Sequence, residues 1–306
     1  MTFSSDHILD RIRLKRRLRI WQGIGVLAVV SALVAIGARL DIFGHQDHIA
    51  RLWVEGVIQD DIERDELIAE LGDDDSVKAV IVRINSPGGT VVGGEALYKN
   101  LRSLASKKPV VAVMGEVAAS AGYMTAIAAD HIVAREGTIT GSIGVLMQSV
   151  NVTGLLDKVG VKPIVVKSAP LKAAPNPLEE VTPEALKATE VVILDMYHMF
   201  LGMVAERRNL AIDDARKLAD GRIFTGRQAK QAGLVDETGS ESQAIKWLQD
   251  EKKVTKGLEV FDALYGEEEF WGHAESALIR SFFDKTLISE GLRLDGLVSV
   301  WQPNLQ

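Results

Sequence analysis

Ser120 lies in a run of small residues, Ala118-Ala119-Ser120-Ala121-Gly122-Tyr123, where the backbone can approach a substrate closely. A serine at the start of a helix could point its hydroxyl into a cleft and act as a nucleophile once a base takes its proton. The commoner role for serine at such a place is helix N-capping, so the local sequence leaves both interpretations open. The segment lacks the G-x-S-x-G pattern of the nucleophile elbow.

A second reactive arrangement is the glycine pair in Asn85-Ser86-Pro87-Gly88-Gly89, which follows an apolar run. Paired glycines adopt conformations that are closed to other residues and can expose adjacent N–H groups. At a strand-to-helix junction, those groups and the dipole of the next helix would stabilise a developing negative charge. A plain turn is the competing interpretation, because Pro-Gly pairs are common in turns.

A serine nucleophile needs a base, and the sequence offers histidines and lysines. None of the six histidines is ordered with a carboxylate into a triad. His131 follows Ser120 closely and stays an alternative base, although a structural role is commoner for a histidine without a motif. Lysine can serve if burial lowers its pKa from about 10.4 toward about 7 or 8. The residues alone do not say which lysine is buried.

The elements that must position these residues alternate between strands and helices. The pattern predicts strands over Arg51–Ile58, Lys78–Asn85, Pro109–Gly115, His131–Ala134 and Lys162–Lys167. It predicts helices over Asp60–Leu71, Val92–Ser106, Ala121–Ala129, Val181–Glu206, Ile212–Leu218, Gly226–Gln231 and Ser240–Glu251. This alternation is typical of an α/β fold with a parallel sheet, in one domain of about 220 residues.

Five segments taken together resemble the signal peptide peptidase A (SppA) family. They are N-S-P-G-G (85–89), A-A-S-A-G-Y (118–123), T-G-S-I-G-V (140–145), K-S-A-P-L-K-A-A-P-N-P (167–177) and G-R-I-F-T-G-R-Q-A…G-L-V-D (221–236). Each is weak alone, but their order and spacing agree with the family over about residues 50–250. The single copy of the set resembles the family's short form.

The resemblance implies a Ser/Lys dyad. Ser120 matches the family's nucleophile, and Lys172 matches its general base. Lys167 lies in the same segment and is the rival base. Ser142 matches a serine that orients the lysine.

The resemblance also implies an oxyanion hole at Gly88 and Gly89, and a Clp protease/crotonase-like fold. Many relatives have S-G-G-Y from the nucleophile onward, whereas this chain has Ala121 after Ser120. Alanine is small enough that we expect activity to survive.

For function, the resemblance implies a serine endopeptidase that cleaves signal peptide remnants and other hydrophobic peptides through an acyl-enzyme. It implies a homo-oligomer, an octamer in the short form, with the dyads facing an enclosed cavity. We expect no metal and no other cofactor, because no metal or nucleotide motif is evident. Two alternatives are a crotonase-like acyl-CoA enzyme and a catalytically silent membrane scaffold. An extracytoplasmic domain argues against the first, and the presence of both Ser120 and Lys172 argues against the second.

The N-terminus predicts a membrane anchor. A basic tail, residues 1–19, precedes an apolar run over 20–38 that would span about 28 Å as a helix, close to the thickness of a bilayer core. The positive-inside rule places the tail in the cytoplasm and everything after Leu40 on the periplasmic side of the inner membrane. A cleavable signal peptide is the competing interpretation, but its apolar region is usually shorter, about 7–15 residues.

Composition and the C-terminus complete the predictions. The net charge of −7 argues against a broad nucleic-acid surface, and the absence of cysteine excludes disulfides and thiolate chemistry. The protease domain is predicted over 50–252, followed by an extension over 253–306. Apolar residues within 276–301 predict core or subunit contacts, with a membrane surface or a neighbour's substrate groove as alternatives.

Overall fold

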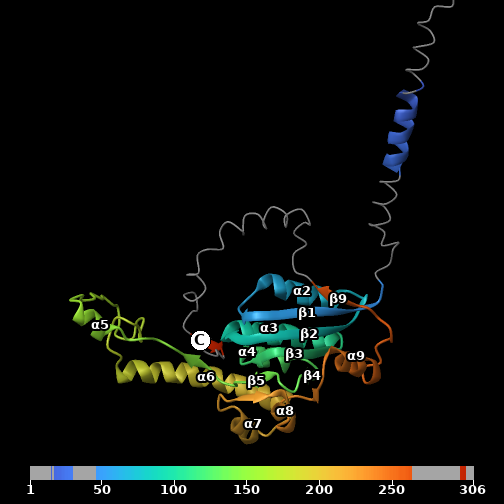
Figure 1. Cartoon of the computed structure of the whole chain (residues 1–306). Coiled ribbons are helices and arrows are strands. Elements are labelled where there is room, and N and C mark those ends of the chain that lie inside the picture. The colour runs from blue at the N-terminus through green and yellow to red at the C-terminus, as the bar shows by residue number, and fades with distance from the viewer. Residues whose placement is uncertain (1–14, 16, 30–45, 264–296, 301–306) are drawn as a thin grey trace, which may run out of the picture. The chain divides into compact units, whose positions relative to one another are not determined.

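The computed structural model describes residues 15, 17–29, 46–263 and 297–300 (Figure 1). The chain divides into two compact units, Met1–Gln46 and Asp47–Gln306. In the first unit, residues 17–29 are helical and their side chains are exposed. The rest of the predicted anchor, residues 30–38, and most of the basic tail lie outside the described residues, so the membrane span stays a prediction.

The second unit is built on one ten-stranded sheet. Its strands are β1 (His48–Ile58), β2 (Val77–Thr90), β3 (Val110–Ala119), β4 (His131–Ala134), β5 (Ile139–Gly141), β6 (Leu146–Met147), β7 (Ile223–Thr225), β8 (Glu237–Thr238), β9 (Val260–Ala263) and β10 (Leu297–Val300). The main path runs β6-β10-β2-β3-β4-β8. β1 pairs with β2 and β9, while β5 pairs with β3 and β7. The pairs among β1, β2, β3 and β4 are parallel, as an α/β fold requires.

Alternation along β2 separates two hydrophobic cores. Val80, Val82 and Ile84 join the larger core, whereas Ala79 and Ile81 face the smaller one. Because successive side chains of a strand point to opposite faces, a fully apolar strand must be covered on both sides. The described part of the second unit is therefore a parallel-centred sheet with helices on both faces.

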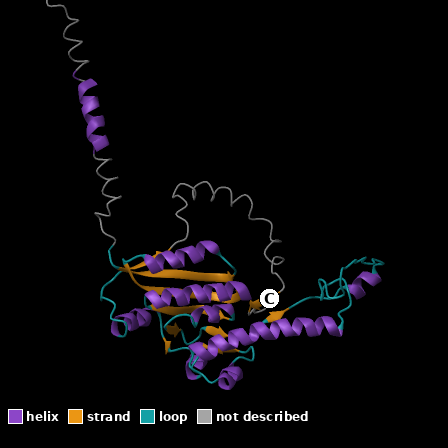
Figure 2. Cartoon of the chain, turned by 180° about the vertical axis from the view of Figure 1, so that it is seen from behind, coloured by secondary structure: helices purple, strands orange, loops and turns teal. Residues whose placement is uncertain are grey.

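The helices of this unit that the structure describes close those cores. They are α2 (Ile62–Asp73), α3 (Val91–Lys107), α4 (Ala121–Ala126), α5 (Thr153–Lys158), α6 (Pro183–Arg207), α7 (Ile212–Leu218), α8 (Gly226–Gln231) and α9 (Glu241–Asp250). Side chains of α3, α4 and α6 fill the larger core, and Ala244 and Leu248 of α9 fill the smaller one. Figure 2 shows the same arrangement from behind.

Helix α6 is the one helix among the described residues that is long and apolar enough to cross a bilayer. Its C-terminal half is instead part of the folded domain, since Phe200, Leu201 and Val204 are buried in the larger core. Its N-terminal half is exposed at Leu186 and Val191. We therefore treat α6 as a core helix with a projecting half.

The projecting half of α6 carries an arm, residues 148–182. The arm contains α5 and lies at the outer end of α6 in both views (Figures 1 and 2). The strand predicted over Lys162–Lys167 is wrong, because these residues form no regular structure. Their β-branched residues favour a strand locally, but no neighbouring strand is available to pair with them.

Candidate active site

Ser120 forms the turn between β3 and α4 (Figure 1). Its φ of 55° and ψ of −120° place it in the left-handed half of conformational space, which glycine normally occupies. Such a backbone costs on the order of 1–3 kcal/mol, and strain of this kind collects at functional sites. The side chain makes no capping hydrogen bond to α4, so helix capping does not account for this serine.

Sheet register brings the predicted glycine pair toward Ser120. Ser86 of β2 pairs with Ala118 of β3. From this pair, two more residues lead to Gly88 along one strand and to Ser120 along the other. Because carboxyl ends of parallel strands meet at one edge of a sheet, these two positions lie at the same edge.

Sheet register places Ser142 at this edge as well. Ala119 of β3 pairs with Gly141 of β5, and the Ser120 N–H donates to the Gly141 carbonyl at 2.8 Å. Ser142 follows directly, with a φ of 49°, and its own N–H donates to the Arg222 carbonyl at 2.8 Å. Ser142 is therefore held beside the Ser120 backbone by main-chain contacts.

The glycine pair is part of β2, so a plain turn over residues 85–89 is the wrong interpretation. Gly88 has a φ of 122°, which side chains disfavour. A Cβ on Gly89 would collide with the carbonyl oxygen of Ile58 in β1. The buried Ser86 hydroxyl accepts a hydrogen bond from the Gly88 N–H at 3.1 Å. Glycine is thus required at both positions by backbone geometry and by close packing.

Helix α4 packs closely enough to explain the small residues around Ser120. A Cβ on Gly122 would lie 2.8 Å from the Ser86 carbonyl oxygen, and one on Gly94 of α3 would lie 2.9 Å from the Ala121 Cβ. Ala121 therefore fits because the facing residue is Gly94. The buried Tyr123 hydroxyl donates to the Leu234 carbonyl at 2.9 Å, and burial raises the pKa of this phenol.

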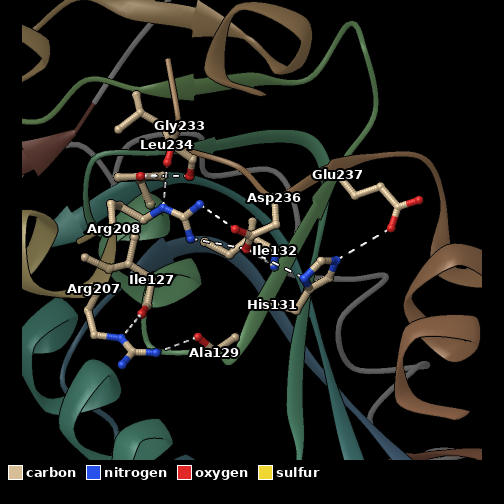
Figure 3. Close-up of polar contacts among 11 residues, drawn as sticks. Ile127, Ala129, His131, Ile132, Arg207, Arg208, Gly233, Leu234, Asp236 and Glu237 are labelled. Atoms are coloured by element: carbon tan, nitrogen blue, oxygen red, sulfur yellow. Dashed lines mark hydrogen bonds and ion pairs between the residues drawn. The ribbon is translucent and has the colours of Figure 1, made fainter. Parts of the chain in front are cut away.

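A network around Arg207 and Arg208 fixes the far end of α4 (Figure 3). Arg207, at the end of α6, donates to the carbonyls of Ile127 and Ala129 at 2.8 and 2.9 Å. Arg208 pairs with Asp236 at 2.6 Å. The sequence patterns did not predict that Arg207 and Arg208 position the site. The one sequence feature that could have pointed to them is Asp236, the last residue of the G-L-V-D motif.

His131 and Ser120 lie at opposite ends of the parallel strands. His131 pairs with Val111, near the start of β3, whereas Ser120 follows the end of that strand. Its ring stacks on Trp247 at 4.6 Å and faces Asp236 at 3.9 Å and Glu237 at 3.6 Å (Figure 3 shows the two carboxylates). This placement argues against His131 as the base for Ser120.

Lys172 belongs to the arm, the segment at the outer end of α6 (Figures 1 and 2). Its side chain is exposed, and its N–H donates to the Ala169 carbonyl at 3.1 Å within a turn. The structure thus gathers Ser120, Ser142 and the two glycines, and it leaves the lysine on a separate segment.

Lys167, the rival base, is engaged elsewhere on the arm. Its ammonium forms an ion pair with Glu179, and only 16% of the Lys167 side chain is exposed. Asn176 donates to the same carboxylate and, at 3.0 Å, to the Ala173 carbonyl. The hydrogen bonds from Lys167 and then Asn176 lower the pKa of Glu179. These contacts tie together the two ends of the loop that carries Lys172.

Metal chemistry has no obvious site in the part of the chain that the structure describes. No group of three or more histidine, cysteine, aspartate or glutamate side chains within it could hold a metal ion.

Comparison with known proteins places this geometry in a family. The family model "Peptidase family S49" matches residues 102–255, and the Clp protease family model matches residues 50–137. The latter match supports a Clp protease-like α/β fold for the sheet and helices described above.

Similar proteins include a putative protease of Methanocaldococcus jannaschii, 35% identical over 272 residues, covering 82% of this chain and 86% of the relative. A putative protease of Synechocystis sp. is 43% identical over 200 residues, covering 65% and 72%. A putative signal peptide peptidase SppA of Enterococcus faecium is 35% identical over 189 residues, covering 61% and 55%. With the resemblance to signal peptide peptidase A proteins confirmed, the chain belongs to peptidase family S49.

Proposed function

We propose that this protein is a serine endopeptidase in which Ser120 is the nucleophile and Lys172 the general base. The observation that carries the proposal is the strained, uncapped Ser120 at the sheet edge that also holds Gly88 and Ser142. In the nucleophile elbow of other hydrolases, a strained serine between a strand and a helix is also the nucleophile, although the G-x-S-x-G pattern of that elbow is missing from this chain.

The chemistry follows from the residue types. Neutral Lys172 takes the proton of the Ser120 Oγ as that oxygen attacks the peptide carbonyl, which forms an acyl-enzyme. Backbone N–H groups at Gly88 and Gly89 stabilise the oxyanion, for which the Gly88 N–H exchanges the Ser86 hydroxyl for the substrate oxygen, and one such donor is worth about 10²–10³ in kcat. Lys172 then gives its proton to the leaving amine, and water releases the acyl group by the same steps. Ser142 orients the lysine.

The position of Lys172 on an exposed arm supports a homo-oligomer. Much of the arm's apolar surface is open to solvent, including Leu155, Val159, Val161, Ile164, Val165 and Val166. Exposed apolar surface of this extent is typical of a subunit interface. We infer that the arm packs on a neighbouring copy and delivers Lys172 to that copy's Ser120.

The substrates and the location rest on similarity and on the N-terminus. One relative is named a putative signal peptide peptidase, so we propose that this protein degrades signal peptide remnants and other hydrophobic peptides. Residues 20–38 anchor it in the inner membrane, the tail before them is cytoplasmic, and the catalytic domain is periplasmic. Reporter fusions after Leu40 that are active only in the cytoplasm would contradict this orientation.

The dyad is tested with purified Ser120→Ala and Lys172→Ala variants on a fluorogenic peptide. Each should lose at least about 10³-fold in kcat, because the nucleophile and its base act as one unit. Lys167→Ala is the matched control and should keep a measurable rate. The assignment fails if either dyad variant turns over at the wild-type rate. A rate that stays flat from about pH 8 to about pH 5 would also contradict a lysine base.

A further inference from the structure

One carboxylate closes the lysine loop, residues 167–179, which carries Lys172. Glu179, at the end of the loop, forms an ion pair with the ammonium of Lys167 at its start. Glu179 also accepts a hydrogen bond from the side chain of Asn176. The residues between the two ends form turns and bends but no helix or strand, so side-chain contacts take the place of regular structure. We call Lys167, Asn176 and Glu179 the clasp.

The clasp reaches the turn on which Lys172 lies. Asn176 donates through its side chain to the Ala173 carbonyl at 3.0 Å, and its side-chain oxygen accepts from the Leu178 N–H at 3.0 Å. Within the turn, the Lys172 N–H donates to the Ala169 carbonyl at 3.1 Å. Ala173 has a φ of 56°, which residues other than glycine rarely adopt and which persists only where surrounding contacts hold it. The clasp therefore fixes the residue directly after Lys172.

The loop has a second attachment that leaves this turn alone. The Val152 N–H donates to the Pro177 carbonyl at 3.0 Å, and the Thr153 hydroxyl donates to the carboxylate of Glu180 at 2.5 Å. These contacts join the end of the loop to the start of α5. Glu179 and Glu180 are thus adjacent carboxylates with different contacts, one within the loop and one outside it.

We propose that Glu179 is a positioning residue, whose carboxylate holds the lysine loop in the conformation that presents Lys172 to Ser120. Lys167 and Asn176 act through the same carboxylate. The inference rests on the proposed function, in which Lys172 is the general base.

The charge on Glu179 suits this role at neutral pH. Hydrogen bonds from Lys167 and then Asn176 lower the pKa of the carboxyl group, so it stays ionised and keeps both contacts. The side chain of Lys172 is exposed, and the contacts described above act on the backbone of its turn. A base that is carried on a turn depends on that backbone, because a misplacement of about 1 Å can cost about 10²-fold in rate.

Kinetics of full-length variants on a fluorogenic peptide test the role. Glu179→Gln keeps the shape of the side chain and removes its charge. It should lower kcat by about 10- to 100-fold and leave KM within about twofold, because a misplaced base weakens an interaction made only in the transition state. Glu180→Gln is the matched control and should keep the wild-type kcat, since its amide oxygen still accepts from Thr153.

Variants of Lys167 show whether the ion pair carries the effect. Lys167→Met keeps the length of the side chain without its charge and should lose as much kcat as Glu179→Gln. Lys167→Arg restores the cation and should bring kcat back to within about threefold of wild type. The double variant Lys167→Met/Glu179→Gln should be no more than about threefold slower than the slower single variant, because both remove one contact. Losses that multiply in the double variant would overturn the shared clasp.

Amide hydrogen exchange tests the clasp without any turnover. The N–H groups of Lys172 and Ala174 donate within the turn, to Ala169 and Leu171 at 3.1 and 3.2 Å. In Ser120→Ala protein, their exchange should be at least about tenfold faster when Glu179→Gln is added, because the turn opens more often. Added Glu180→Gln should leave their exchange unchanged.

The outcomes separate this inference from the proposed chemistry. A wild-type kcat in Glu179→Gln overturns the positioning role even if Lys172→Ala proves inactive. A loss of kcat that comes with a smaller oligomer by light scattering also overturns it, because Glu179 would then serve assembly. Faster exchange in the loop, together with wild-type turnover by Lys172→Ala, would keep the clasp and reject the proposed function.

Discussion

The placement of Lys172 on the arm leads to a prediction about mixed assemblies. Ser120→Ala and Lys172→Ala should each be inactive when expressed alone. Co-expression of the two should restore activity if each active site takes its serine from one copy and its lysine from the next. A subunit with Lys172→Ala still offers Ser120, and its neighbour with Ser120→Ala still offers Lys172.

The expected magnitude follows from counting sites in a closed ring with head-to-tail contacts. In an equal random mixture, half of the subunits keep the serine and half keep the lysine. Both occur together at about one site in four, so the activity should be about a quarter of the wild-type value. The arrangement in which Lys172 serves its own chain predicts no recovery at all.

A dilution series gives the same distinction with an active partner. Wild type is co-expressed in equal amount with the double variant Ser120→Ala/Lys172→Ala. Sites shared between copies leave about a quarter of the activity, whereas sites within one chain leave about half. The assay is turnover of a fluorogenic peptide by detergent-purified protein, with subunit ratios measured by mass spectrometry. No recovery in the first mixture and half activity in the second would refute the shared site.

Three further predictions concern the support of the site. Tyr123→Phe leaves the Leu234 carbonyl without its buried donor and should lower the free energy of unfolding by about 1–3 kcal/mol, measured by urea titration. A change below about 0.5 kcal/mol would contradict that role. Gly89→Ala would drive a methyl group into the β1 backbone, so it should abolish turnover, and retention of the wild-type kcat would show that β2 can move aside. The pKa of Glu179 is depressed from its ordinary value of 4.5, so its ion pair with Lys167 is complete above that pH and is lost as pH falls through the lowered pKa. Acid-active protease should cut the arm faster only below about pH 4.5, and Glu179→Gln should show that faster cleavage at every pH.

Sequence patterns predicted the central elements well because those elements are decided locally. The helix over Ile212–Leu218, the helix over Gly226–Gln231 and the strand over His131–Ala134 lie where they were predicted. Apolar periodicity and end signals are properties of short windows. The short strands β5 to β8 were missed because two or three residues carry no periodicity, and pairing with distant strands defines them.

The candidate site also has residues whose positions the sequence predicts and residues whose positions depend on distant segments. The positions that Ser120 and Gly88 take at the ends of adjacent strands follow from parallel pairing, which the predicted strands already implied. The interpretation of residues 85–89 as a turn failed because β1 and β10 pair with this segment from both sides, and no local pattern reveals that. The place of Lys172 could not be read from the residues, since it depends on where a long excursion from the sheet ends.

Helix α6 joins the folded domain, near α4, to the arm that carries Lys172. Its 25 residues make a rod of about 37 Å, anchored at one end by Arg207 on the carbonyls that close α4. At its first residue, Pro183, it meets the arm, so under the proposed sharing of the lysine the helix links one copy's folded domain to the lysine offered to the next copy. A newly made subunit would then be a protease without a base, harmless to the proteins around it. Proteolysis would begin only where enough copies assemble to complete one another.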